Sequence, residues 1–138
     1  MSAQPLPQTA NDVPEVIYSY TRRQALADGF QVQVPDATAR EAGFRCPVYV
    51  TRSAWNLCVE VPEGVTCQDV DGRLWDLLWM ARMAAKHSEE EGGTPLPFVA
   101  YVRNTARRPK KAQLYVQAGA NDIDDPTPCL CIMLPEDL

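Results

Sequence analysis

The chain has 138 residues, of which 46% are hydrophobic and 22% are charged, and its formal net charge is −5. This length suits one domain, and no apolar run approaches the roughly 18 residues of a membrane span. The negative charge disfavours a general coat for nucleic acid. Five cysteines are an odd number and no secretory signal opens the sequence, so we expect a soluble cytoplasmic protein with free thiols.

The first half of the sequence predicts a flexible tail, a short extended run and three short helices. Residues 1–14 are polar, contain proline and show no periodicity, whereas residues 15–138 have the patterning of a single domain. An extended run is expected at residues 15–20. The helices are expected at residues 22–28, at 39–42, and from Arg52 to a point before Pro62, with N-caps at Thr21, at Asp36 or Thr38, and at Thr51.

Four segments with alternating apolar residues predict strands, at residues 30–34, 98–102, 113–117 and 129–134. The first alternates with Gln31 and Gln33, which suits a solvent-exposed face or an edge of the sheet, whereas the last is apolar on both faces and belongs inside the sheet. Connections at 103–111 and 119–128 are short enough for antiparallel neighbours. We expect these charged bends to point outward.

A long helix is expected from Asp69 or Asp71 to about Ser88, and it carries two apolar stripes. One stripe consists of Leu74, Leu77, Leu78, Ala81 and Ala85. The predicted fold is therefore α+β, an antiparallel sheet of about four strands with one long helix packed on it and two or three short N-terminal helices.

The second stripe of the long helix consists of Trp75, Trp79 and Met83. We favour burial of this stripe beneath the three short helices, with Trp55 and Tyr20 as neighbours, because apolar stripes at helical spacing are normally packed. The alternative is an exposed partner-binding stripe, since tryptophan is enriched among binding hot spots.

A basic loop joins the second and third predicted strands and carries Arg103, Arg107, Arg108, Lys110 and Lys111. These cations could bind the phosphates of a nucleic acid or an acidic partner. We favour a solvated hairpin tip, because no aromatic residue interleaves the cations as stacking on single strands would require.

Neither a metal nor a cofactor is predicted. Cys129 and Cys131 have the wrong spacing for a zinc ligand pair, and small apolar core residues are the simpler interpretation of all five cysteines. His87, the single histidine, suits the end of the long helix better than a Cys–His catalytic pair. The acidic run Asp122–Asp125 lacks the glycine and the distant glutamate of an EF-hand loop.

Four strings in the chain resemble an uncharacterised bacterial family, a domain of unknown function in small proteins often encoded on plasmids and integrative elements. The strings are IYSYTRRQALADG (17–29), AREAGFRCPVYVTRSAW (39–55), GRLWDLLWMAR (72–82) and IMLPED (132–137). The resemblance implies a bacterial cytoplasm and a mobile element, and it supplies no catalytic residues.

The function predicted from the sequence is that of a non-enzymatic accessory binding protein with a protein partner and no membrane association. Two alternatives stay open. One is nucleic-acid binding through residues 103–111, and the other is an enzyme whose groups form no linear motif.

Overall fold

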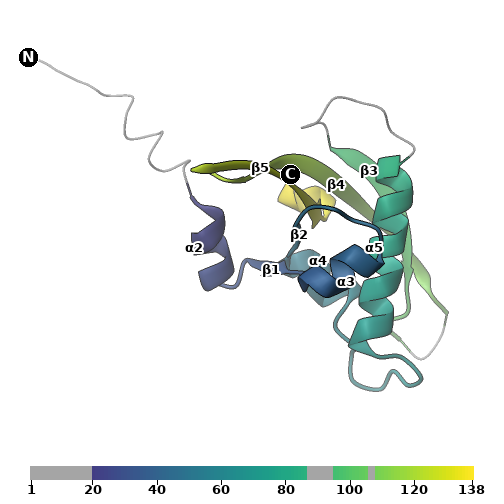
Figure 1. The fold of residues 1–138 in the computed structure, drawn as a ribbon. Helices are drawn as coiled ribbons and strands as arrows, with labels where there is room; N and C mark the ends of the chain where they lie inside the picture. Colours follow the sequence, from purple (N-terminus) through teal and green to yellow (C-terminus); the bar gives the residue numbers. More distant parts are fainter. Residues whose placement is uncertain (1–19, 87–94, 106–107) are drawn as a thin grey trace, which may run out of the picture.

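The computed structural model describes residues 20–86, 95–105 and 108–138. The predicted tail, the extended run up to Ser19, His87 and Arg107 lie outside these residues. The helices are α2 (Arg22–Ala27), α3 (Asp36–Glu41), α4 (Arg52–Cys58), α5 (Val70–Lys86) and the 3-10 helix η1 (Pro135–Asp137). The strands are β1 (Gln31–Gln33), β2 (Val48–Thr51), β3 (Leu96–Val102), β4 (Lys110–Asp122) and β5 (Asp125–Met133) (Figure 1).

The α+β class is confirmed, but the sheet has five strands in the order β1-β2-β5-β4-β3 and is mixed. The expectation of a purely antiparallel sheet is wrong because β2 pairs with β5 in parallel, Val48 opposite Leu130 and Val50 opposite Ile132. The other three pairings are antiparallel. As predicted, β1 lies at an edge and β5 in the interior.

Local signals placed most of the helices correctly. Thr21 caps α2 with a full capping box, and Thr51 accepts the amide of Ala54 at the start of α4. The side chain of Asp69 accepts the amide of Gly72 at the start of α5, at 2.7 Å. The second helix differs from its prediction: it begins at Asp36 after Pro35, which makes no side-chain cap, so Thr38 lies inside the helix.

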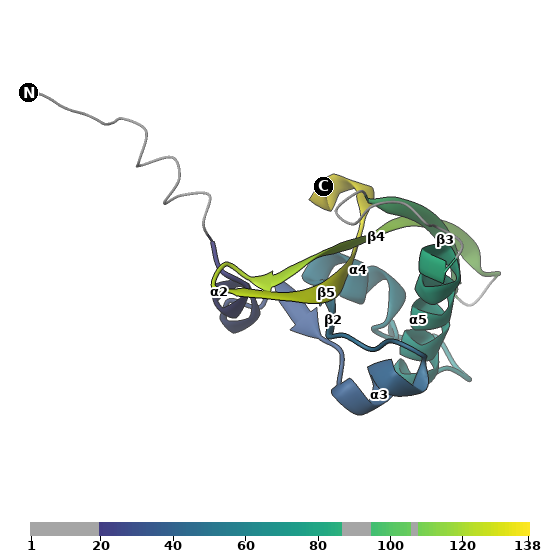
Figure 2. The same ribbon diagram turned by 45° about the horizontal axis from the view of Figure 1, so that its top comes forward.

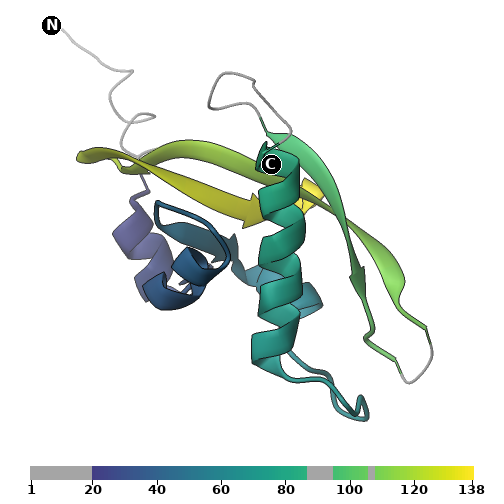
Figure 3. The same ribbon diagram turned by 45° about the vertical axis from the view of Figure 1, so that its right-hand side comes forward.

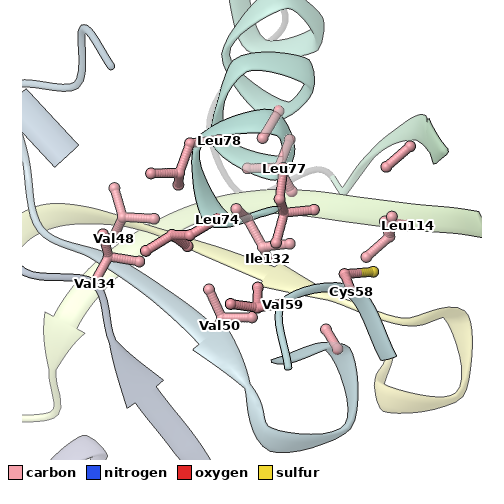
Figure 4. Close-up of a cluster of buried hydrophobic side chains, with 14 of the residues drawn as sticks. Val34, Val48, Val50, Cys58, Val59, Leu74, Leu77, Leu78, Leu114 and Ile132 are labelled. Carbon is pink, nitrogen blue, oxygen red and sulfur yellow. The ribbon is translucent and has the colours of Figure 1, made fainter. Parts of the chain in front are cut away.

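The main core lies between the sheet and α5. Leu74, Leu77, Leu78 and Ala81 on α5 are at most 3% exposed, whereas Ala85 is half-buried, so the first apolar stripe of the long helix is confirmed for four of its five residues. The side chains of Leu74, Leu77 and Leu78 point toward residues of the strands and of α4 (Figure 4). Figure 3 shows α5 running across the strands, so one helix covers residues from several of them. Burial of this stripe is the main apolar contribution to the fold.

A smaller cluster covers part of the opposite face of the sheet. It consists of Tyr49, Cys129, Cys131 and Met133, with Leu26 of α2 and Tyr115 packed against it. Because successive side chains of a strand alternate between faces, Tyr49 points away from its core neighbours Val48 and Val50. Figure 2 shows α2 at the far end of the sheet from α5, beside the β4–β5 hairpin.

The β4–β5 connection is much tighter than the predicted loop at residues 119–128. The strands continue to Asp122 and Asp125, which face each other, and two residues make the turn. An irregularity between Ala120 and Asp122 turns Asn121 out of register. The Asn121 side chain accepts a hydrogen bond from the hydroxyl of Tyr49 at 2.6 Å.

The expectation that the acidic bend points outward holds for Asp124, which is exposed, but is wrong for Asp122, which is only 8% exposed and caps α2. Its carboxylate accepts the amides of Arg22 at 3.0 Å, Arg23 at 3.2 Å and Ile123 at 2.7 Å. Desolvation acts to raise the pKa of Asp122, but these three amides and the charge of Arg23 outweigh it and lower the pKa. The ionised carboxylate of Asp122 is therefore one link between the hairpin and α2, beside the ion pair of Arg23 with Asp124 and the hydrogen bond from the Arg22 guanidinium to the carbonyl oxygen of Asn121.

This carboxylate makes the stability of the protein depend on pH. A carboxyl with a lowered pKa in the folded state stabilises the fold above its ordinary value of 3.8. The stabilisation is lost as the pH falls through the lower, folded pKa. We expect Asp122→Asn to lower the free energy of unfolding at pH 7 and to flatten its decline below pH 3.8, as measured by urea denaturation. Glu60→Gln, at an exposed position, should keep the wild-type profile; an unchanged profile for Asp122→Asn would contradict this role.

Candidate partner-binding face

The second stripe of α5 is open to solvent. Trp75 is 38% exposed and Trp79 is 45% exposed, while Met83 is half-buried. Burial beneath the three short helices, the interpretation favoured from the sequence, is wrong for the two tryptophans. The two aromatic residues expected to cover the stripe lie elsewhere: Trp55 packs against the main core, and Tyr20 packs against Phe30 with ring centroids 6.2 Å apart.

An open hollow of about 980 Å³ lies beside Trp75, between α3, the segment before α5 and the first turns of α5. Figure 1 shows α3 beside the lower half of α5. Four carboxylates line the hollow, those of Glu41, Asp69, Asp71 and Asp76. The hollow was not predicted from the sequence, because Glu41 reaches it from a helix nearly thirty residues earlier in the chain than Asp69.

The carboxylates that line the hollow differ in their hydrogen bonds and ion pairs. Asp69 is used as the cap of α5, whereas Asp71 lies in the first turn, where a negative charge suits the helix dipole. Glu41, Asp71 and Asp76 are exposed, and their side chains make no hydrogen bond or ion pair with another residue that the structure describes. The hollow therefore carries negative charge that the described fold does not neutralise.

The floor of the hollow is Arg73, a buried guanidinium that the sequence analysis missed. It is 7% exposed and donates to the carbonyl oxygens of Cys58 at 3.0 Å, Leu57 at 3.2 Å and Arg103 at 3.0 Å. It also donates to the side chains of Gln68 at 2.8 Å and Asn104 at 2.6 Å. Desolvation lowers the pKa of Arg73. Because its donors are used within the fold, Arg73 is a structural cation rather than a free anion site.

Gly43 lets α5 approach the end of α3 closely. Its φ is +101°, and a Cβ built there would lie 2.1 Å from Nε of Arg82. A side chain at this position would therefore be strained and would also collide with Arg82. The Arg82 side chain therefore lies against the backbone that follows α3, two residues from Glu41 in the wall of the hollow.

The structure separates the cations of the predicted basic loop. Arg103 is half-buried and donates to the carbonyl oxygen of Thr66, so it braces the segment before α5. Arg108 is exposed, and Lys110 and Lys111 begin β4 rather than lying in the loop. Lys111 faces Tyr101 across the β3–β4 ladder, and Tyr101 is 62% exposed. This aromatic neighbour could not be seen without the strand register.

The interpretation of the cysteines as core residues is confirmed for Cys58, Cys129 and Cys131, which are buried. It is wrong for Cys67, which is exposed, and holds only in part for Cys46, which is half-buried. Desolvation raises the pKa of Cys58 to about 11, against the opposing charge of Arg73, so its thiolate is disfavoured. Within the described part of the chain, no three metal-ligating side chains come together.

Comparison with known proteins found no match: no family model, no curated protein and no solved structure is similar to the chain. The resemblance to an uncharacterised bacterial family stays a prediction. Among residues 20–86, 95–105 and 108–138, no helix combines the length and the apolar character needed to cross a membrane.

Arg73 should be essential to the stability of the chain segments that surround the hollow. We expect Arg73→Met to lower the free energy of unfolding by about 3 kcal/mol, because buried carbonyl oxygens lose a charged donor. Arg73→Lys should recover part of this loss, since an ammonium supplies fewer and differently placed donors. Chemical denaturation measures both, and the exposed Arg108→Met is the control, within about 0.5 kcal/mol of wild type. Equal stability of Arg73→Met and Arg108→Met would contradict the role.

Proposed function

We propose that the protein is a non-enzymatic accessory binding protein of the bacterial cytoplasm, associated with a mobile element, and that its partner contacts Trp75, Trp79 and Met83 of α5. The observation that carries the proposal is the exposure of two tryptophans, one helical turn apart, on a helix whose opposite face is fully packed. Large aromatic side chains on the surface are typical of protein-binding hot spots.

The hollow favours binding over catalysis. General acid–base catalysis needs carboxylates held in position by neighbouring groups. Glu41, Asp71 and Asp76 have no such neighbours among the described residues. Surface carboxylates without such neighbours suit a binding site in which the partner supplies the hydrogen-bond donors.

The proposal is tested by capture of partners from extracts of the native cell. We expect Trp79→Ser to lose the specific partner that the wild-type chain captures, while its free energy of unfolding falls by about 1 kcal/mol or less. Tyr101→Ser is the matched control, because it removes an exposed aromatic residue from a strand rather than from α5. Capture that is unaffected by Trp79→Ser, or a collapse of stability in that variant, would refute the proposed surface.

Nucleic-acid binding is the second candidate, and one observation favours it. Tyr101 and Lys111 are paired on the face of the β3–β4 ladder that points away from the core, with Arg108 and Lys110 nearby in the chain. This places an exposed ring next to the cation of Lys111, and a ring beside a cation is the combination used to stack bases and hold phosphates of single strands.

Fluorescence anisotropy with a labelled single-stranded oligonucleotide tests this candidate. If Arg108, Lys110 and Lys111 each contact a phosphate, the logarithm of the association constant should fall with the logarithm of salt concentration with a slope of about −2. Tyr101→Ser should weaken binding, and Trp79→Ser should not. No binding at low salt, or equal binding by both variants, would remove nucleic acid as a ligand of this surface.

A further inference from the structure

The partner proposed above must meet the acidic hollow, because Trp75 belongs to both surfaces. Trp75 lies on the exposed stripe of α5 and also lines the hollow with Glu41, Asp71 and Asp76. We infer that the partner inserts a cationic segment, carrying arginine or lysine side chains, into this hollow. The inference rests on the proposed function and specifies the chemistry of its partner.

Charge complementarity is the first argument. Four carboxylates line the hollow against one guanidinium, that of Arg73, whose donors are bound by carbonyl and amide oxygens of the fold. Asp69, the cap of α5, is enough to offset the roughly half positive charge at the start of the helix, which leaves Glu41, Asp71 and Asp76 as excess negative charge. The net charge of −5 acts in the same direction, since it attracts cationic partners at long range.

The aromatic residue supplies the second argument. An arginine or lysine that approaches the carboxylates also approaches the ring of Trp75, which attracts cations through its π face. Arginine satisfies both groups, because its planar guanidinium stacks on a ring while it donates to a carboxylate. The hollow thus offers a cation two kinds of favourable contact.

The arrangement suits an extended segment better than a single metal ion. Within the described residues the carboxylates do not gather into a group that could hold a metal. They are spread over a hollow of about 980 Å³, at the upper end of the range of small-molecule pockets. A peptide with several spaced cations can reach separate carboxylates in such a volume.

The cations near this surface limit where the partner can lie. Arg82 packs over Gly43, two residues after Glu41 at the C-terminal end of α3, and Lys86 lies in the last turn of α5. Both disfavour a cationic segment at that end of the helix. The segment should therefore occupy the first turns of α5, around Trp75, while the apolar part of the partner covers Trp79.

Titration of a short labelled peptide in which arginine alternates with alanine tests the inference by fluorescence anisotropy. We expect binding at low salt that Asp71→Asn/Asp76→Asn weakens about tenfold and Trp75→Ala weakens about threefold. The control Glu60→Gln/Glu63→Gln removes the same net charge at exposed positions outside the hollow, and should change the affinity less than twofold. Unfolding curves of each variant confirm that the fold is retained.

Three results would overturn the inference. The first is equal weakening by the two charge-matched double variants, which would indicate attraction to net charge alone. The second is comparable binding of a glutamate–alanine peptide. The third is a dimer in sedimentation equilibrium that is lost both with Asp71→Asn/Asp76→Asn and with Lys110→Ala/Lys111→Ala, which would make a second copy of this chain the occupant. A further result would overturn this inference alone: the arginine peptide does not bind, while capture of the cellular partner still depends on Trp79. The proposed contact with Trp75, Trp79 and Met83 would then be retained, and a cationic partner segment would be excluded.

Discussion

The buried guanidinium of Arg73 joins the segments that frame the candidate site. It holds the carbonyl oxygens at the end of α4, the side chain of Gln68 before α5 and residues Arg103 and Asn104 after β3. A charged group in the interior must be hydrogen-bonded, because its desolvation costs several kcal/mol. The hydrogen bonds of this one buried cation thus fix three chain segments at the first turns of α5, where Trp75 and the carboxylates lie.

The sequence predicted the features of the fold that depend on residues close together in the chain. Thr21 and Thr51 were identified as caps because an N-cap needs only the next few residues, and the core stripe of α5 follows from helical spacing. The parallel pairing of β2 with β5 was missed because it joins residues about eighty positions apart. The four residues of β2 are too few to show a period, and burial on both faces removes any alternation.

The candidate site was predicted in part. The stripe of Trp75, Trp79 and Met83 came from helical spacing, but its exposure depends on where the short helices pack, which the sequence did not reveal. The acidic hollow needs α3 to lie against α5, and the pairing of Tyr101 with Lys111 needs the strand register. Arg103, Arg108, Lys110 and Lys111, close together in sequence, take different places in three dimensions, and Arg103 braces the segment before α5. Proximity along the chain is a poor guide to a shared surface.

The Asp122 cap of α2 has a consequence for synthesis on the ribosome. The amide of Arg22 and its carboxylate acceptor are 100 residues apart, so the helix lacks this cap until the hairpin has left the exit tunnel, although β1 and Tyr49 are made earlier. At about 5–20 residues per second, that interval lasts roughly 5–20 seconds. The nascent α2 lacks its Asp122 cap for this time, and β2 likewise waits for β5. The order of translation therefore makes the last hairpin the element that closes the fold.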